Sequence, residues 1–178
     1  KAIAQQDAIL DLQPWDTGYY SEKLKVQQFN LSQESLKPYF PAPKILQGLF
    51  SIVNRLYGIN IVQREAPVWH PDAHYFELED QGIVVGGFYF DLYARSGKRG
   101  GAWMSGFRSR MQTENGIQKP ICYMVCNFTP AVGDQPALLT HDEVNTLFHE
   151  FGHGLHHMLT EVDHIAVAGT HGVDWDAV

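Results

Sequence analysis

Cysteine is scarce in this sequence, which contains only Cys122 and Cys126. A secreted domain of this size usually carries a framework of disulfides, so the scarcity favours a reducing compartment such as the cytoplasm. The two cysteines lie four positions apart in a predicted strand, on the same face but too far apart along it for a disulfide. We therefore expect two free, buried thiols.

Long hydrophobic runs and clusters of positive charge are also missing. No stretch approaches the roughly 18 apolar residues of a transmembrane helix, so we expect no membrane partner. The 13 Lys and Arg residues are outnumbered by 20 Asp and Glu residues, and the formal net charge of −7 leaves no basic stripe for a nucleic acid. With 44% hydrophobic residues, the composition is typical of a globular protein with a packed core.

The sequence has no repeats, low-complexity tracts or long linkers. Its length falls within the roughly 100–200 residues of one domain, so we expect residues 1–178 to form a single unit. The first residue is lysine, no leader follows it, and the last residues show no helix cap. We therefore expect an internal fragment of a longer polypeptide.

Helical patterns occupy the beginning of the chain. Residues 16–29 contain few helix breakers, and a short helix that follows them is predicted to stop at Pro38. Residues 43–58 have apolar side chains at helical spacing, with Pro43 at the start and Gly58 at the end. These helices are predicted to form a scaffold.

The middle of the chain is rich in aromatic and β-branched residues and is divided by turn residues. This pattern predicts a small, mostly antiparallel sheet with strands at residues 73–80, 83–94 and 120–128. Residues 95–106 contain too many glycines for a regular element, so a loop is predicted there. Helices and sheet together predict an α+β fold.

A long final helix is predicted from about His141 to about Leu159. Thr140 and Glu143 form a capping-box pattern, in which each side chain accepts a hydrogen bond from the other residue's amide. Apolar residues at helical spacing form one continuous stripe along this helix. The stripe consists of Val144, Leu147, Phe148, Phe151, Leu155, Met158 and Leu159. The opposite side carries histidines where a surface helix would carry lysine or arginine.

His149, Glu150 and His153 form an H-E-x-x-H motif on that opposite side. One helical turn separates the two imidazoles, so both can reach one Zn²⁺ at about 2.0–2.1 Å. Glu150 lies beside the first ligand, where it can take a proton from a water on the metal. The motif indicates zinc-dependent peptide hydrolysis on a zincin-type active-site helix. The alternative is a polar helix face that matches by chance, which the capped start and the apolar stripe disfavour.

Two further histidines follow the motif. His156 lies seven residues beyond His149, about 10.5 Å along a helix axis, so the two cannot share one metal ion. A substrate-facing role for His156 and a hydrogen-bonded, partly buried position both stay open. His157 is predicted to be exposed. The metzincin motif requires glycine at the position of His156, so that class is excluded.

Longer stretches carry a resemblance to a known family. The chain resembles the thimet-oligopeptidase family of zinc metallopeptidases in "PWDTGYYSEK", "FYFDLYARSGKRGGAWM", "VCNFTP", "HDEVNTLFHEFGHGLHHML" and "GVDWDAV". The stretch around H-E-x-x-H is far more specific than the five-residue motif. The resemblance covers nearly the whole chain.

The resemblance implies a cytosolic endopeptidase for short peptides, as part of a larger, mainly helical oligopeptidase with its zinc site at the bottom of a deep channel. His149 and His153 carry over as zinc ligands and Glu150 as the general base. Family members take a third ligand from a glutamate on the next helix, and the matching position comes immediately after Val178. The partners implied are short peptides and the remainder of the polypeptide.

Several positions are assigned to the substrate more weakly. Gly169 and Gly172 belong to a "GTHG" segment that is similar to a flexible family loop near the substrate, and His156 is the third candidate. Gly101 and Ala102 lie beside an expected edge strand, where a peptide could add by backbone pairing.

Three alternatives remain open from the sequence. Asp174 or Asp176 could supply the third ligand if the tail folds back. The chain could be a non-catalytic fragment or peptide-binding module without a competent metal site. Within the family, it could belong to a dipeptidyl carboxypeptidase. Without the third ligand, the 178-residue chain is expected to bind zinc weakly and to be inactive alone.

Overall fold

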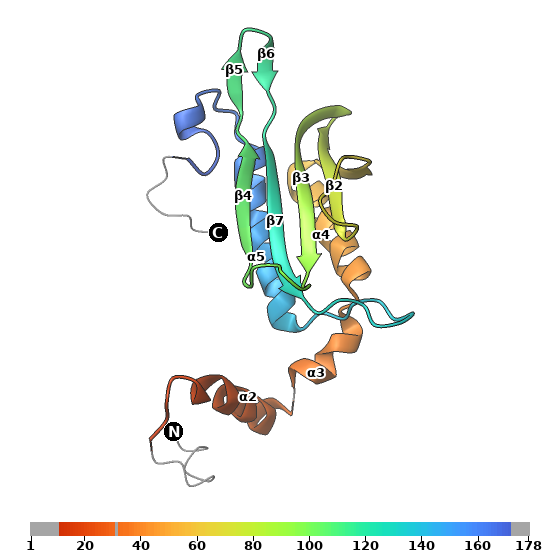
Figure 1. Ribbon diagram of the computed structural model, residues 1–178, viewed down its shortest axis with the longest axis vertical. Helices are drawn as coiled ribbons and strands as arrows, with labels where there is room; N and C mark the ends of the chain where they lie inside the picture. The colour runs from red at the N-terminus through yellow and green to blue at the C-terminus, as the bar shows by residue number, and fades with distance from the viewer. Residues whose placement is uncertain (1–10, 31, 172–178) are drawn as a thin grey trace.

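A five-stranded sheet organises the chain (Figure 1). The structure is a computed structural model that describes residues 11–30 and 32–171, so Gly172, Asp174 and Asp176 lie outside the described residues. The strands follow the order β1-β2-β3-β7-β4 across the sheet. Their bounds are β1 Asn60–Arg64, β2 Ala73–Asp80, β3 Ile83–Tyr93, β4 Trp103–Arg108 and β7 Ile121–Phe128. A separate hairpin is formed by β5 Met111–Thr113 and β6 Gly116–Gln118.

Most strand pairs are antiparallel, as predicted, but β3 and β7 run parallel and make the sheet mixed. The β2–β3 hairpin turns through Gln81 and Gly82, whose φ angles are 48° and 82°. Positive φ at both central residues matches the right-handed twist of the flanking strands. The parallel pair arises because the chain leaves β3, adds β4 at the edge, and returns through β7 between them.

The helices lie on one side of this sheet or below it (Figure 1). α4 and α5 cover the same face, with α4 behind β1 and β2 and α5 along β7 and β4. α2 buries none of its residues. The helical bounds are α2 Asp16–Phe29, α3 Gln33–Leu36, η1 Lys37–Tyr39, α4 Ala42–Tyr57, α5 His141–Met158 and η2 Ile165–Val167. No described helix is both long enough and apolar enough to cross a membrane.

The hydrophobic core lies between the sheet and these two helices. Phe88 stacks on Phe76 with ring centroids 5.1 Å apart and meets Phe151 of α5 edge-on at 5.4 Å. Leu49 and Val53 contribute the buried side of α4. Aromatic pairs in such geometries add about 0.5–1.5 kcal/mol each beyond their area burial, so they help to hold α5 against the sheet.

The sequence predictions of α2, α4, α5 and the strands β2, β3 and β7 are confirmed within a residue or two. The loop predicted over 95–106 is wrong in its last part, because Trp103–Arg108 forms β4. β4 is a glycine-containing strand, and within residues 11–30 and 32–171 it pairs with β7 alone, so its structure depends on a distant partner. The strands β1, β5 and β6 were not predicted either.

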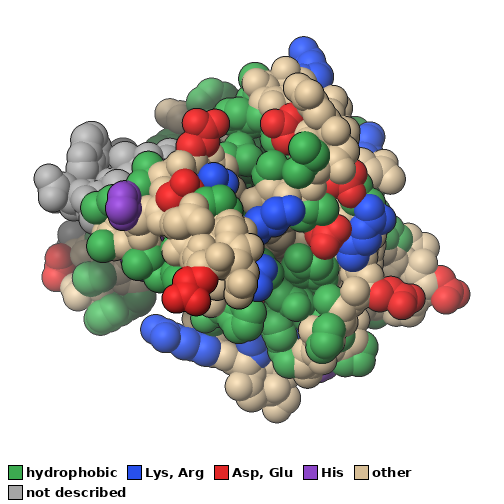
Figure 2. All heavy atoms as spheres, turned by 90° about the horizontal axis from the view of Figure 1, so that it is seen from above, with side chains coloured by type: hydrophobic (Ala, Val, Ile, Leu, Met, Phe, Trp, Pro, Cys, Tyr) green, Lys and Arg blue, Asp and Glu red, His purple; other side chains and the backbone are tan. Residues whose placement is uncertain are grey.

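The two cysteines are free and buried, as predicted. Burial raises the pKa of the Cys122 thiol to about 12, and burial followed by the charge of Glu150 raises that of Cys126 to about 12. Cys122 and Cys126 both lie on the face of β7 that packs against α5. At the end of the molecule seen in Figure 2, acidic and basic side chains are interspersed, and neither sign gathers into a patch there.

Candidate metal centre and active site

The capping box at the start of α5 is present as predicted. Thr140 Oγ1 accepts a hydrogen bond from the Glu143 amide at 3.1 Å, and Glu143 Oε2 accepts one from the Thr140 amide at 2.7 Å. Two of the unpaired amides of the helix start are thereby satisfied. This cap sets where α5 begins and so which side chains face the sheet.

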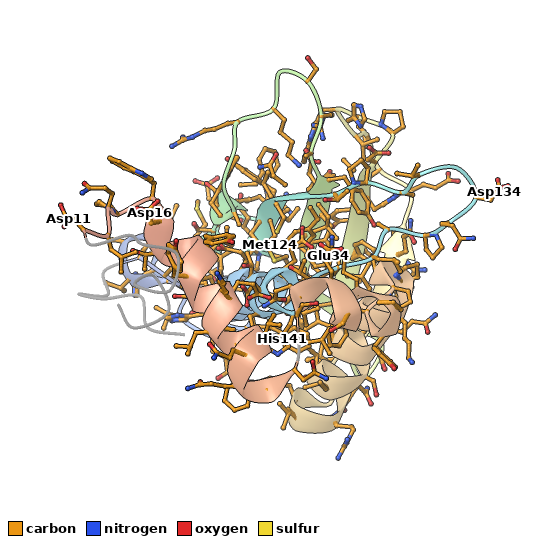
Figure 3. All side chains as sticks on the ribbon, turned by 90° about the horizontal axis from the view of Figure 1, so that it is seen from below. Asp11, Asp16, Glu34, Met124, Asp134 and His141 are labelled. Atoms are coloured by element: carbon orange, nitrogen blue, oxygen red, sulfur yellow. The ribbon has the colours of Figure 1, made fainter. Side chains whose placement is uncertain are left out.

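α5 approaches β7 very closely. Leu147, Phe151 and Met158 are each about 1% exposed. A Cβ at Gly154 would lie 2.9 Å from Met124 Sδ, closer than side chains tolerate. Met124, labelled in Figure 3, lies between the helix and the sheet. Glycine at this position therefore lets the helix backbone rest directly on the strand.

His149 and His153 converge at one point on α5. Their Nε2 atoms are 3.0 Å apart, and the ring centroids are 4.6 Å apart with the planes nearly perpendicular. Two nitrogens at about 2.0–2.1 Å from one tetrahedral zinc ion would lie about 3.3–3.4 Å apart. His149 is exposed and His153 is half-buried, so the convergence point is open on one side. The imidazole pair fits a zinc ion.

Glu150 lies next to this pair but is only 8% exposed. Its charge contributes to the raised pKa of Cys126, after burial, so the carboxylate lies near the end of β7. Glu150 is thus largely away from bulk water, and it directly follows His149 in the sequence. A general base for a water at the histidine pair is needed close to that pair.

The pair also lies beside the edge strand β4. Alternate residues Ala102, Met104 and Gly106 face the core side, and a Cβ at Gly106 would lie 3.0 Å from His157 Cε1. α5 and β4 run in the same direction (Figure 1). His149 lies eight residues before His157, about 12 Å along the helix axis. Ala102 lies four residues before Gly106, about 13 Å along the strand. Ala102 therefore lies at about the level of His149.

The described residues bring two candidate metal ligands together here and no third. Within residues 11–30 and 32–171, no group of three or more His, Cys, Asp or Glu side chains could hold a metal ion. Catalytic zinc sites use three protein ligands. Any third ligand to the His149–His153 pair must come from outside the described residues.

The remaining predicted substrate residues divide between two places. Gly101 has φ +100°, and its carbonyl accepts a hydrogen bond from Asn127 Nδ2 at 2.7 Å, directly before the edge strand. Gly169, by contrast, is buried against His157. The structure thus brings Gly101 and Ala102 toward the H-E-x-x-H motif and Gly169 toward the far end of α5.

The two histidines that follow the H-E-x-x-H motif lie in different environments. His156 is exposed, which removes the partly buried alternative. The prediction that His157 is exposed is wrong, since it is 1% exposed and its Nε2 lies 3.1 Å from the carbonyl oxygen of Arg108. Burial lowers its pKa. The error follows from β4, which covers His157 and was predicted as part of a loop.

The opposite face of the sheet carries a feature that the sequence analysis missed. An open cavity of about 700 Å³ lies there, with walls that include Trp69, Tyr89, Trp103 and Tyr123. Asp91, 2% exposed, forms its polar part. An aspartate inside a strand as apolar as 83–94 was the available signal, because a buried charge needs partners.

Asp91 is held by three donors. Arg95 donates two hydrogen bonds to its carboxylate at 2.6 and 2.8 Å, and Lys98 and Trp69 donate one each at 2.9 Å. Burial alone would raise the pKa of Asp91, but these hydrogen bonds hold it well below its usual range. Lys98 also donates to the Cys126 carbonyl at 2.6 Å, so the cluster fastens the loop before β4 to β7.

Comparison with known proteins identifies the class. The family model described as "Peptidase family M3" matches residues 1–178, and the chain belongs to that family, the thimet-oligopeptidase family predicted from the sequence.

Among its relatives, the chain is 54% identical to oligopeptidase A of Escherichia coli over 182 aligned residues, which cover 100% of this chain and 27% of the relative. It is 49% identical to oligopeptidase A of Haemophilus influenzae, covering 96% of this chain and 25% of the relative. Identity to the dipeptidyl carboxypeptidase of E. coli is 40%, covering 94% and 25%. The chain spans about a quarter of the length of these curated relatives.

Proposed function

We propose that this chain is the part of a zinc oligopeptidase that carries the H-E-x-x-H helix, and that the whole protein hydrolyses short peptides at internal bonds. The observation that carries the proposal is the convergence of His149 and His153 Nε2 at 3.0 Å beside the buried carboxylate of Glu150. Membership of peptidase family M3 and the similarity to oligopeptidase A support it.

In this mechanism His149 and His153 hold the zinc ion, with a third ligand from the rest of the polypeptide. When bound, the ion lowers the pKa of a water and polarises the scissile carbonyl. Glu150 takes the proton of the attacking water and passes it to the leaving amine. Its burial keeps it out of bulk water, and its place in the sequence directly after His149 supports this role.

The substrate backbone is proposed to pair with the free edge of β4. Among the described strands β4 is hydrogen-bonded only to β7, and its other edge is proposed to take an extended peptide. Gly101 and Ala102 lie directly before that edge at about the level of His149, which would bring a scissile bond next to the histidine pair.

The free thiols favour a reducing, cytoplasmic location for the protein.

The test is Glu150→Gln in the full-length polypeptide, with Glu65→Gln as the matched control at an exposed position directly after β1. The amide can still hydrogen-bond the water but cannot take its proton, so hydrolysis should fall by about three orders of magnitude or more while zinc stays stoichiometric. The control should retain both. Near-normal turnover of Glu150→Gln would remove this residue from the mechanism.

The same preparation separates the alternatives. A dipeptidyl carboxypeptidase, for which the 40% identity is the supporting observation, would release only dipeptides from the carboxyl end of a blocked peptide. An oligopeptidase would cut internally. A peptide-binding module would bind the peptide and leave it intact, and metal analysis of that sample would find no stoichiometric zinc.

A further inference from the structure

His157 is enclosed by three separate segments of the chain. Its Nε2 lies 3.1 Å from the Arg108 carbonyl oxygen at the end of β4. A Cβ at Gly106 would lie 3.0 Å from its ring, and a Cβ at Gly169 would lie 2.9 Å from its Cα. Gly169 also has φ +62°, where L side chains are strained. Glycine is therefore required on both sides of this imidazole.

The Arg108 carbonyl belongs to an irregular part of the edge strand. The pairing of β4 with β7 shifts register between Gly106 and Arg108. At such a bulge one residue has no partner in the ladder, here Phe107, and the strand bends locally. His157 Nε2 donates to the Arg108 carbonyl beside this bulge, and this assigns the proton to Nε2 and leaves Nδ1 as the bare nitrogen, facing Gly169.

Further contacts join the segment after β4 to the segment after α5. Arg110 Nε donates to Asp163 Oδ1 at 2.7 Å, and the Gln112 amide donates to the Asp163 carbonyl at 3.0 Å. Ser109 Oγ lies 3.0 Å from His171 Nε2. His157 is the one buried side chain among these contacts, since Arg110, Asp163, Ser109 and His171 are all at least partly exposed.

From these contacts we infer that His157 is a positioning residue. It fixes the distance between the end of edge strand β4 and α5, the helix that carries His149 and His153, and it holds residues 168–171 against the same helix. The inference rests on the proposed function, in which the peptide pairs with β4. His157 lies one turn beyond His153 on the same helix, so it links the position of the peptide-binding edge directly to that of the metal ligands.

The role predicts a change in substrate affinity without loss of the metal. Replacing His157 by leucine removes the side-chain hydrogen bond that joins the Arg108 carbonyl at the end of β4 to α5. The strand end should shift or loosen, while His149 and His153, on the preceding turns, keep their geometry. Because misplacements of about 1 Å can cost up to about a hundredfold, we expect KM to rise about tenfold or more.

The experiment compares His157→Leu, His157→Gln and His74→Leu in the full-length polypeptide. Glutamine can place its Nε2 amide where the imidazole Nε2 lies, so it should restore KM to within about threefold of the unchanged protein. His74→Leu makes the same change at an exposed histidine of β2 and should leave KM unchanged. All three variants should keep stoichiometric zinc, and kcat should fall less than KM rises.

Hydrogen exchange supplies a readout that does not depend on hydrolysis. In His157→Leu, amides of residues 106–112 and 165–171 should exchange faster, while those of 141–153 stay protected. If the leucine variant does not fold, Gly106→Ala provides the second perturbation, since its added Cβ presses on the same ring and should produce the same KM and exchange changes.

Unchanged KM in folded His157→Leu, or failure of His157→Gln to restore it, would overturn the inference. So would loss of zinc from His157→Leu with residues 106–112 still protected. If Glu150→Gln retains turnover, the proposed function fails, but the exchange measurement still decides whether His157 holds β4 and residues 168–171.

Discussion

Replacement of Gly154 by alanine tests how closely α5 must approach the sheet. Glycine inside a helix is less favourable than alanine by about 1 kcal/mol, so the change alone should stabilise the protein. The added Cβ, however, would lie 2.9 Å from Met124 Sδ, 3.3 Å from its Cε and 3.6 Å from Cys122 Sγ. Met124 and Cys122 are fully buried, so neither side chain can move into solvent. Overpacking of this kind costs about 1–3 kcal/mol.

The net expectation for Gly154→Ala is a loss of up to about 2 kcal/mol in the free energy of unfolding. Gly48 of α4 is the matched control, because a Cβ there would meet nothing within 4 Å. Gly48→Ala should gain about 1 kcal/mol. For a chain of this size the pair should differ by several degrees in Tm, at about 2–4 °C per kcal/mol.

Urea unfolding of both variants, followed by circular dichroism, is the assay. The double variant Gly154→Ala/Met124→Ala should recover part of the loss caused by the clash, relative to Met124→Ala alone. Equal stabilisation by Gly154→Ala and Gly48→Ala would refute the reasoning, since it would mean that α5 does not rest on β7 at this point.

Three other outcomes are expected. Zinc titration should give weak or no binding to the 178-residue chain and tight binding to a version extended about forty residues past Val178. The reason is that two histidines alone lack the third ligand of a catalytic site. Equal tight binding by both would place that ligand inside the present sequence. Asp91→Leu should lower the free energy of unfolding in urea by about 3–5 kcal/mol, since it leaves Lys98, 5% exposed, without its carboxylate partner. An unchanged urea midpoint would show that the charge cluster around Asp91 is dispensable for stability. Because the pKa of His157 is lowered, chiefly by burial, the unfolded state binds a proton below about pH 6.5 before the folded state does, so stability should fall as pH drops through that range. His157→Gln should flatten this part of the pH profile.

The sequence by itself determined the features that depend on neighbours within one or two helical turns. The capping box at Thr140 and Glu143, the length of α5 and the apolar stripe all follow from local hydrogen bonds and the 3.6-residue period. The same period brings His149 and His153 to one point, because four residues make just over one turn. The family could also be read from motifs along the chain.

Only the tertiary structure decided what lies across from α5. β4 contains Gly106, has a register shift and pairs with β7 from a distance in sequence, so its residues alone resemble a loop. Once it pairs, β4 covers His157, and Ala102 directly before it packs against the core. The burial of His157 and the charge cluster around Asp91 likewise depend on contacts between residues far apart in sequence, and such contacts form only when the whole sheet assembles.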